Sequence, residues 1–215
     1  MALTLILILT PLLLYKYHSR KEENLAKIQD KAESLSEHIL LAGTWVRHKE
    51  GIFTENSSNE EDAFRYWGTY SYLSALSSFS QETLEYGFRL VSRNPLNEDN
   101  SPNAQEYKVL NELNPAKSAN NFSIYQDEED QFWYLYLTPV IAHESCMRCH
   151  GEQGFSEGDV LGALSLALPF NEEMIELSNI RVSFVLIGLL IIGGTSLMLY
   201  VVLGRIFIIP FQSFM

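Results

Sequence analysis

The chain has 215 residues, of which 47% are hydrophobic and 20% are charged. This composition is too apolar for a disordered polypeptide, and the length suits one domain with additional segments. The 27 acidic residues outnumber the 15 lysines and arginines, so the formal net charge is −12 at pH 7. Because phosphate contacts need clustered lysines and arginines, a duplex nucleic-acid-binding protein is excluded.

The first predicted element is an N-terminal membrane anchor, residues 1–16. Residues 2–15 form an apolar run, which suits either a short anchor or the central part of a signal peptide. No small-residue cleavage site follows, only the segment KYHSR at 16–20. We therefore expect a retained anchor, and we expect the natural N-terminus to lie upstream of Met1.

A long stalk helix is predicted over residues 17–50. Its apolar positions alternate in steps of three and four, which is typical of a heptad stripe on one helix face. The stripe needs a partner, either the helix's own domain or a second copy in a membrane-proximal dimer stalk. It consists of Leu25, Ile28, Ala32, Leu35, Ile39, Ala42 and Val46.

The central segment, residues 51–170, is predicted to fold as one α+β domain, because helices come first and an antiparallel sheet follows. The clearest sheet signal is a β-hairpin, in which aromatic and β-branched residues flank the acidic turn 127–130. The expected elements are a helix at 62–82, a strand at 87–92, a helix at 104–113, hairpin strands at 121–125 and 132–137, and a buried strand at 159–168 that Pro169 ends.

A transmembrane helix is predicted near the C-terminus. Residues 182–204 form an uncharged apolar run, which is long enough to span a hydrocarbon core about 30 Å thick. Residues 171–204 are therefore assigned as linker and membrane helix, and residues 205–215 as a short cytoplasmic tail. Together with the N-terminal anchor, this predicts two transmembrane helices flanking the central domain.

Both cysteines lie in one motif, Cys146-Met147-Arg148-Cys149-His150. This is the C-x-x-C-H signature of covalent c-type haem, in which two thiols bind the haem and the adjacent histidine binds the iron. A disulfide, a redox dithiol and half a zinc site are the alternatives. Zinc needs further soft ligands, and a thioredoxin-like dithiol needs a βαβ context, whereas GEQG follows the motif here. We therefore predict one haem c, with His150 on the iron.

The haem motif and the charge distribution predict opposite topologies. Haem c is attached on the outer face of the bacterial membrane, which places residues 16–180 in the periplasm and the protein in the inner membrane. The positive-inside rule would instead keep this segment in the cytoplasm, because Lys16, Arg20, Lys21, Lys27 and Lys31 follow the first anchor. We follow the haem chemistry, so both termini are expected in the cytoplasm.

Several segments in a fixed order carry a resemblance to a known family. They are residues 45–53, the Ser-Arg-Asn-Pro-Leu-Asn segment at 92–97, residues 134–139, the haem motif with Gly151, and residues 158–165. Over about residues 38–170 the chain resembles the family of membrane-anchored periplasmic c-type haem sensor domains with a PAS-like fold. Such domains, often described only as domains of unknown function, are found ahead of histidine kinases and chemoreceptors.

The resemblance implies a haem held against a PAS-like antiparallel sheet, with His150 as the proximal iron ligand. His48 stands at the family's histidine position and is the first candidate for the distal ligand. His38 lies on the same helical stripe and is the second candidate, and an open distal site is the third possibility. Met147 is confined between the two thioether cysteines and is excluded.

Arginines are predicted to bind the two haem propionates through charge-assisted hydrogen bonds. Arg89 and Arg93 lie near the Asn-Pro segment, and Arg148 lies within the motif. The alternative for each is an ordinary surface arginine. Trp133, Tyr134 and Tyr136 are expected either to line the porphyrin or, as aromatic residues of a strand, to belong to the core.

Two functions follow from these features. In the first, the domain is a sensor, in which haem redox state or a small distal ligand changes the arrangement of the helices that lead to the membrane. In the second, it is a membrane-tethered electron-transfer cytochrome subunit of a larger complex. No arrangement of acid, base and nucleophile predicts an enzyme. The expected partners are the membrane and either a second copy of the chain or a partner membrane protein.

Overall fold

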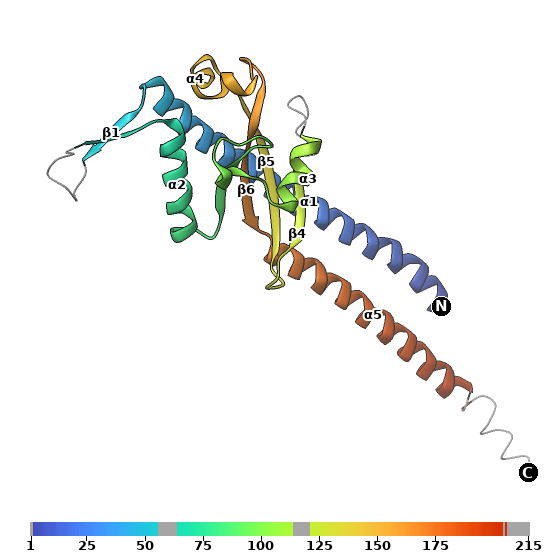
Figure 1. Cartoon of the computed structure of the whole chain (residues 1–215). Helices are drawn as coiled ribbons and strands as arrows, with labels where there is room; N and C mark the ends of the chain where they lie inside the picture. Colours follow the sequence, from blue (N-terminus) through green and yellow to red (C-terminus); the bar gives the residue numbers. More distant parts are fainter. Residues whose placement is uncertain (1, 56–63, 114–120, 204, 206–215) are drawn as a thin grey trace, which may run out of the picture. The chain divides into compact units, whose positions relative to one another are not determined.

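The computed structural model describes the backbone of residues 2–55, 64–113, 121–203 and 205, with the side chains of these residues except 2–9 and 53–67. The chain divides into two compact units (Figure 1). The first, Ala26–Asn171, is called here the sheet unit. The second, Met1–Leu25 with Glu172–Met215, is called the helical unit.

A four-stranded antiparallel sheet forms the centre of the sheet unit, in the order β3-β6-β5-β4. The central strands β6 (Val160–Pro169) and β5 (Phe132–Ile141) are longer than the outer strands β3 (Gly87–Val91) and β4 (Phe122–Gln126). With the long N-terminal helix, this sheet confirms the predicted α+β class. The PAS-like character of the sheet stays a prediction.

The β4–β5 hairpin forms as predicted, and one carboxylate organises its turn. Asp127 Oδ1 accepts hydrogen bonds of 2.9 Å from the backbone N–H groups of Glu129 and Gln131. Its Oδ2 accepts a bond of 2.7 Å from the indole Nε1 of Trp133. Because these donors favour the ionised form, first of all Trp133, they lower the pKa of Asp127.

One face of the sheet packs against helix α3 (Ala104–Glu112). The helix begins with a capping box, in which Asn103 accepts from the backbone of Glu106 and the Glu106 side chain accepts from the backbone N–H of Asn103. Apolar side chains of alternate strand positions meet the helix here, as the two-residue period of a strand requires. The buried cluster is Val91, Val109, Leu110, Leu135, Leu137 and Ala163.

The other face packs against α2 (Thr69–Thr83) and against the part of α1 (Ala2–His48) that belongs to the sheet unit, from residue 26 onward. Within the sheet unit, the hydroxyl of Tyr136 donates a hydrogen bond of 3.4 Å to Glu33 of α1. Burial, together with the charge of Glu33, raises the pKa of Tyr136 to about 12. Ser77 of α2 donates to the backbone carbonyl of Phe88 on β3. The side chain of Tyr134 is also fully buried, so the strand tyrosines belong to the core.

The predicted stripe on α1 is buried in part. Ile28, Ala32, Ile39 and Val46 are buried, whereas Leu25, Leu35 and Ala42 are only half-buried. Small residues beside the stripe, Ser36 and Gly43, are buried as well. Gly43 lies so close to Leu73 of α2 that a Cβ on this glycine would stand 2.9 Å from the Leu73 Cδ1. From residue 26 onward the stripe is therefore covered by the helix's own domain, as one of the two interpretations expected. A dimer stalk stays a prediction.

The helix predicted at 62–82 is wrong in its first residues. A two-stranded antiparallel hairpin precedes the helix, formed by β1 (Ile52–Glu55) and β2 (Phe64–Trp67). The aromatic run of β2 favours a strand, and Gly68 in extended conformation separates it from α2.

Strand β5 continues four residues beyond its predicted end at 137 and contains Pro139. Leu137 directs its N–H away from β6, to the carbonyl of Asn121. The nitrogen of Pro139, two residues on, points the same way, where β4 no longer pairs because its register ends at Phe122↔Tyr136. A proline is tolerated there because no ladder hydrogen bond is lost.

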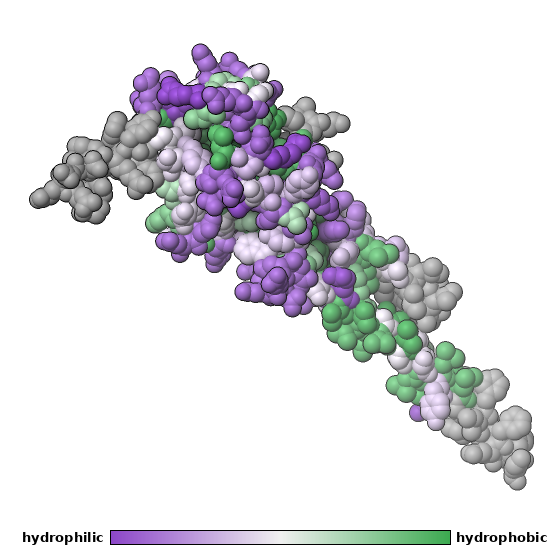
Figure 2. Space-filling model, in the orientation of Figure 1, coloured by the Kyte–Doolittle hydropathy of each residue, from purple (hydrophilic) through white to green (hydrophobic). Residues whose placement is uncertain are grey.

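In the helical unit, α5 (Asn171–Leu203) is long and apolar enough to cross a membrane. It is the one such helix in the part of the chain that the structure describes. Figure 2 shows its apolar surface, and none of the side chains in its most apolar stretch is buried within the protein. The predicted first anchor falls within α1, but most of its side chains, residues 2–9, lie outside the described ones. A second transmembrane helix therefore stays a prediction.

The two helices of this unit also share a polar seam. Arg20 of α1 forms ion pairs with Glu23 at 3.1 Å and with Glu176 of α5 at 3.2 Å. Asn24, which is buried, donates a hydrogen bond of 3.2 Å to the other carboxylate oxygen of Glu176. These contacts tie α1 and α5 together directly before the apolar part of α5.

Candidate cofactor-binding site

The C-x-x-C-H motif lies in the connection between the two central strands, β5 and β6. The connection contains three short helical segments, Glu144–Cys146, α4 (Met147–His150) and Gly151–Gln153. Its base is closed by hydrogen bonds between Ala142 and Asp159 at 2.7 Å and between Gly158 and Ala142 at 2.9 Å. The motif is therefore a folded projection at one end of the sheet (Figure 1).

Both thiols of the motif are free. Cys146 is half-buried and Cys149 is exposed. Because they stand three residues apart in helical backbone, their side chains lie on the same side of the turn. The disulfide that the sequence left open is not formed, and the described residues hold no group of three or more His, Cys, Asp or Glu side chains that could bind a metal ion such as zinc.

The imidazole of His150 is held by the side chain of Gln153. Its Nδ1 lies 2.6 Å from Gln153 Oε1, and Gln153 Nε2 donates a hydrogen bond of 3.0 Å to the backbone carbonyl of Asn94. A carbonyl only accepts, so the amide must present its nitrogen to Asn94 and its oxygen to His150. The hydrogen of the imidazole contact is therefore on Nδ1, and in the neutral ring Nε2 keeps a free lone pair.

An aromatic ring further restricts this imidazole. Phe155 meets the ring of His150 edge to face, with centroids 6.1 Å apart and planes at 79°. His150 itself is half-buried. With Gln153 on Nδ1 and Phe155 against the ring, both the position and the plane of the imidazole are fixed.

The predicted Asn-Pro segment lies beside the motif. The loop that follows β3 is tied to the start of β6, since Ser92 Oγ donates a bond of 2.6 Å to the carbonyl of Leu161. The contact of Asn94 with Gln153 joins the same loop to the motif. Arg93 lies in this loop, next to the residue that contacts Gln153, and Arg148 lies in the motif; both arginines are exposed.

Arg89, in contrast, is engaged under α3. Its Nε lies 3.2 Å from Glu106 Oε1, an ion pair that lacks hydrogen-bond geometry, and its Nη2 donates to the carbonyl of Ser101. Glu106 in turn accepts a bond of 2.7 Å from Ser165 of β6. These contacts account for the side chain of Arg89, so its propionate role stays a prediction that none of its contacts supports.

His48 and His38 are both exposed on α1. His38 donates from Nδ1 to the carbonyl of Ser34 at 2.5 Å. Neither histidine has a contact with the motif among the described residues. The C-terminal end of α1 nevertheless lies at the motif's end of the sheet unit (Figure 1), since Gly43 contacts α2 and Tyr70 of α2 accepts hydrogen bonds from the loop after β3.

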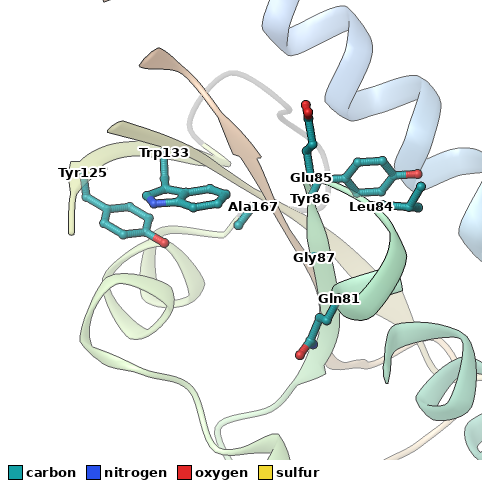
Figure 3. A pocket seen from close by; sticks show the side chains of 8 residues that line it. All are labelled: Gln81, Leu84, Glu85, Tyr86, Gly87, Tyr125, Trp133 and Ala167. Atoms are coloured by element: carbon teal, nitrogen blue, oxygen red, sulfur yellow. The ribbon is translucent and has the colours of Figure 1, made fainter. Parts of the chain in front are cut away.

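A cleft of about 300 Å³ lies at the opposite end of the sheet (Figure 3). The rings of Tyr125 and Trp133, which are register partners on β4 and β5, form one wall, and Gln81 of α2 stands across from them. None of the motif residues lines this cleft. The lining residues are Gln81, Leu84, Glu85, Tyr86, Gly87, Tyr125, Trp133 and Ala167.

Comparison with known proteins places these features in a family. The family model described as Tll0287-like matches residues 21–169. This range includes the whole four-stranded sheet and leaves out only the two ends of the chain. The chain belongs to the Tll0287-like family. A similar solved structure is the crystal structure of the cyanobacterial haem protein Tll0287, with 19% identity, 68% of this chain and 95% of that chain covered, and a TM-score of 0.41. No curated protein shows a significant match.

Membership of the Tll0287-like family supports the predicted resemblance in its coarser form. Membrane anchoring, periplasmic location and an association with histidine kinases stay predictions. Sequence reasoning missed Gln153 and Phe155, although both lie within five residues of the motif. The available signal was the carboxamide three residues after His150, a spacing at which two side chains of a helical turn meet.

Proposed function

We propose that this chain carries one covalently attached haem c, bound by Cys146 and Cys149, with His150 Nε2 as the proximal iron ligand. The observation that carries the proposal is the 2.6 Å contact of His150 Nδ1 with Gln153 Oε1. Because the amide nitrogen of Gln153 donates to Asn94, this contact assigns the hydrogen to Nδ1 and leaves Nε2 free to bind iron. Two free thiols on the same side of a helical turn fit the two thioether bonds of haem c. The haem would supply a one-electron redox centre at this loop.

The haem domain is, in this proposal, a membrane-bound periplasmic sensor of redox state or of a small distal ligand. The apolar helix α5 supports membrane attachment, and haem c attachment outside the cytoplasm supports a periplasmic domain on the bacterial inner membrane. His48 is the first candidate for the distal ligand and His38 the second. Both lie on α1, the helix that leads back to the helical unit, so a ligand from α1 would link the iron to that helix.

The positions of two arginines support propionate binding at this site. Arg93 and Arg148 stand exposed on the segments that adjoin the imidazole, where their guanidinium groups can bind propionates in an otherwise acidic protein. Arg89 would have to leave Glu106 to do the same.

A second candidate function is electron transfer between this haem and a partner membrane protein. The observation that favours it is the exposure of Cys149 and Arg148, because a haem attached at an exposed cysteine would be accessible to a docking partner. Binding of carbon monoxide to the reduced wild type distinguishes a sensor of a small ligand from an electron-transfer haem. A ligand sensor with an open or weakly bound distal site takes up the gas, whereas a haem with two strong ligands does not and fits electron transfer or redox sensing.

The experiment that tests haem attachment is a pyridine haemochrome spectrum of the full chain, produced with a cytochrome c maturation system and purified in detergent. We expect one haem per chain, retained through acid-acetone extraction. In Cys146→Ala and Cys149→Ala attachment weakens, and in the double variant it is lost. Met147→Leu, a matched change within the motif, retains haem. Haem that resists extraction in the double variant would contradict the proposal.

A further inference from the structure

We propose that Gln153 is a positioning residue that sets the electron donation of His150 to the iron and couples the imidazole to the loop after β3. The inference rests on the proposed haem site. It starts from the relay His150–Gln153–Asn94, whose two contacts measure 2.6 and 3.0 Å. A side-chain amide is the group that can accept from an imidazole and donate to a carbonyl at the same time.

The first consequence is electronic. A hydrogen bond from the Nδ1–H of a ligating histidine to a carbonyl oxygen raises the basicity of Nε2 and fixes the ring orientation. A more basic imidazole stabilises the oxidised iron relative to the reduced iron. Gln153 is therefore expected to lower the reduction potential relative to a variant without an acceptor at this position.

The second consequence is mechanical, because Asn94 belongs to a loop with little freedom of its own. Ser92 binds the carbonyl of Leu161 at 2.6 Å, and its N–H donates to the carbonyl of Asn100 at 3.0 Å. The amide of Asn97 then donates 3.0 Å to the hydroxyl of Tyr70 in the first turn of α2. A displacement of the imidazole is thus passed through Gln153 to this loop and to the start of α2.

Two substitutions separate the two consequences. Gln153→Leu removes both the acceptor and the donor. Gln153→Glu keeps an acceptor for His150, and a stronger one, but removes the donor to Asn94. Asn94→Ala is the matched control, because it keeps the backbone carbonyl that Gln153 uses. Glu152→Gln, on the adjacent exposed residue, controls for a change of charge near the haem.

The readouts are the midpoint potential of the full-length haem protein and hydrogen exchange of the backbone amides of residues 92–100. In Gln153→Leu we expect the potential to rise, with about a tenfold change in the redox equilibrium, or roughly 59 mV for one electron, and faster exchange in the loop. In Gln153→Glu we expect a lower potential with the same faster exchange. Both controls should match the wild type in exchange, and Asn94→Ala should also match it in potential.

The outcomes keep this inference apart from the proposed function. A potential that moves in the same direction in both Gln153 variants, or loop exchange that stays unchanged in both, overturns the role of Gln153 while leaving haem binding in place. A wild-type protein without covalent haem overturns both proposals. A merely structural effect of Gln153 would change exchange in both variants without opposite shifts of the potential.

Discussion

Ser165 of β6 donates a 2.7 Å hydrogen bond to Glu106 of α3 across the interface between helix and sheet. Glu106 is 2% exposed, and it also accepts the backbone N–H of Asn103 and pairs with Arg89. One carboxylate thus caps the helix, fastens it to the central strand and balances the guanidinium on β3. Such a fully satisfied buried charge is costly to alter, because its partners lose their hydrogen bonds together.

Glu106→Gln should lower the free energy of unfolding by about 1–3 kcal/mol. An amide loses the ion pair with Arg89 and has only one oxygen for donors that the carboxylate serves with two. Urea unfolding of the purified protein measures the change. Glu112→Gln, on the exposed end of the same helix, should leave the unfolding free energy within about 0.5 kcal/mol, and an equal loss in both variants would contradict this account.

Gly162→Ala should destabilise the sheet by about 3 kcal/mol or more, as overpacking against rigid backbone does. A Cβ at this position would overlap the carbonyl oxygen of Val91 on the neighbouring strand. Gly87→Ala is the control on the same pair of strands, because its Cβ would meet only the flexible side chain of Gln81, 3.3 Å away. The melting temperatures of the two variants decide the matter, and equal values would show that β3 can move aside.

Asp127→Asn should remove part of the acid sensitivity of the fold. Hydrogen bonds, the largest from Trp133, lower the pKa of Asp127 in the folded state, so its stabilising contribution is present above the ordinary aspartate pKa of about 3.9. That contribution is lost as pH falls through the folded pKa. Unfolding free energies measured between pH 3 and 6 should fall less steeply with acid in Asp127→Asn than in the wild type. Glu128→Gln in the same turn should follow the wild-type slope.

His48→Ala should convert a six-coordinate low-spin haem spectrum into a high-spin one and raise the affinity for carbon monoxide, because it removes the proposed distal ligand. His38→Ala should change neither property. Optical spectra of the oxidised and reduced proteins provide the measurement. A wild type that is already high-spin would mean an open distal site, and an unchanged low-spin spectrum in both variants would assign the iron to a different residue.

An alkaline phosphatase fusion after Gly158 should be enzymatically active, because haem c attachment requires the sheet unit outside the cytoplasm. Activity in whole cells, normalised to fusion protein level, gives the result. A fusion to the same enzyme after Arg205 should be inactive if α5 spans the membrane. A silent fusion at Gly158 would restore the assignment that the basic residues after the first anchor favour.

The strands that the sequence predicted best are those with strong local signals. The β4–β5 hairpin carries aromatic residues on both sides of a turn in which Asp127 accepts hydrogen bonds from residues close to it in sequence. Such local patterns can be recognised from the sequence alone. The segment around Phe64–Trp67 was assigned to a helix because a short aromatic run has no clear period. The end of β5 was placed too early because a proline usually ends a strand. Pro139 is tolerated within β5 because β4 is too short to pair with it. No local sequence pattern reveals the length of a neighbouring strand.

At the candidate site too, the residues that are close in sequence were predicted, whereas the contacts between distant residues were not. Cys146, Cys149 and His150 lie within five residues of one another, so the motif was recognisable from the sequence. The partner of Gln153 is the carbonyl of Asn94, 59 residues away, and every residue has such a carbonyl. Arg89 lay near the right segment in sequence, but alternation along β3 turns it toward Glu106 beneath α3.

The strand order has a consequence for how the protein is made. β6 is the last strand in the chain but lies second in the sheet, between β3 and β5. β3 therefore has no partner in the sheet until β6 has been synthesised, and its contact through Ser92 closes a loop of 69 residues. Only Phe170 separates β6 from α5. The sheet can therefore be completed only when the chain has been made as far as the start of α5, so that folding of the sheet is followed directly by emergence of the apolar helix.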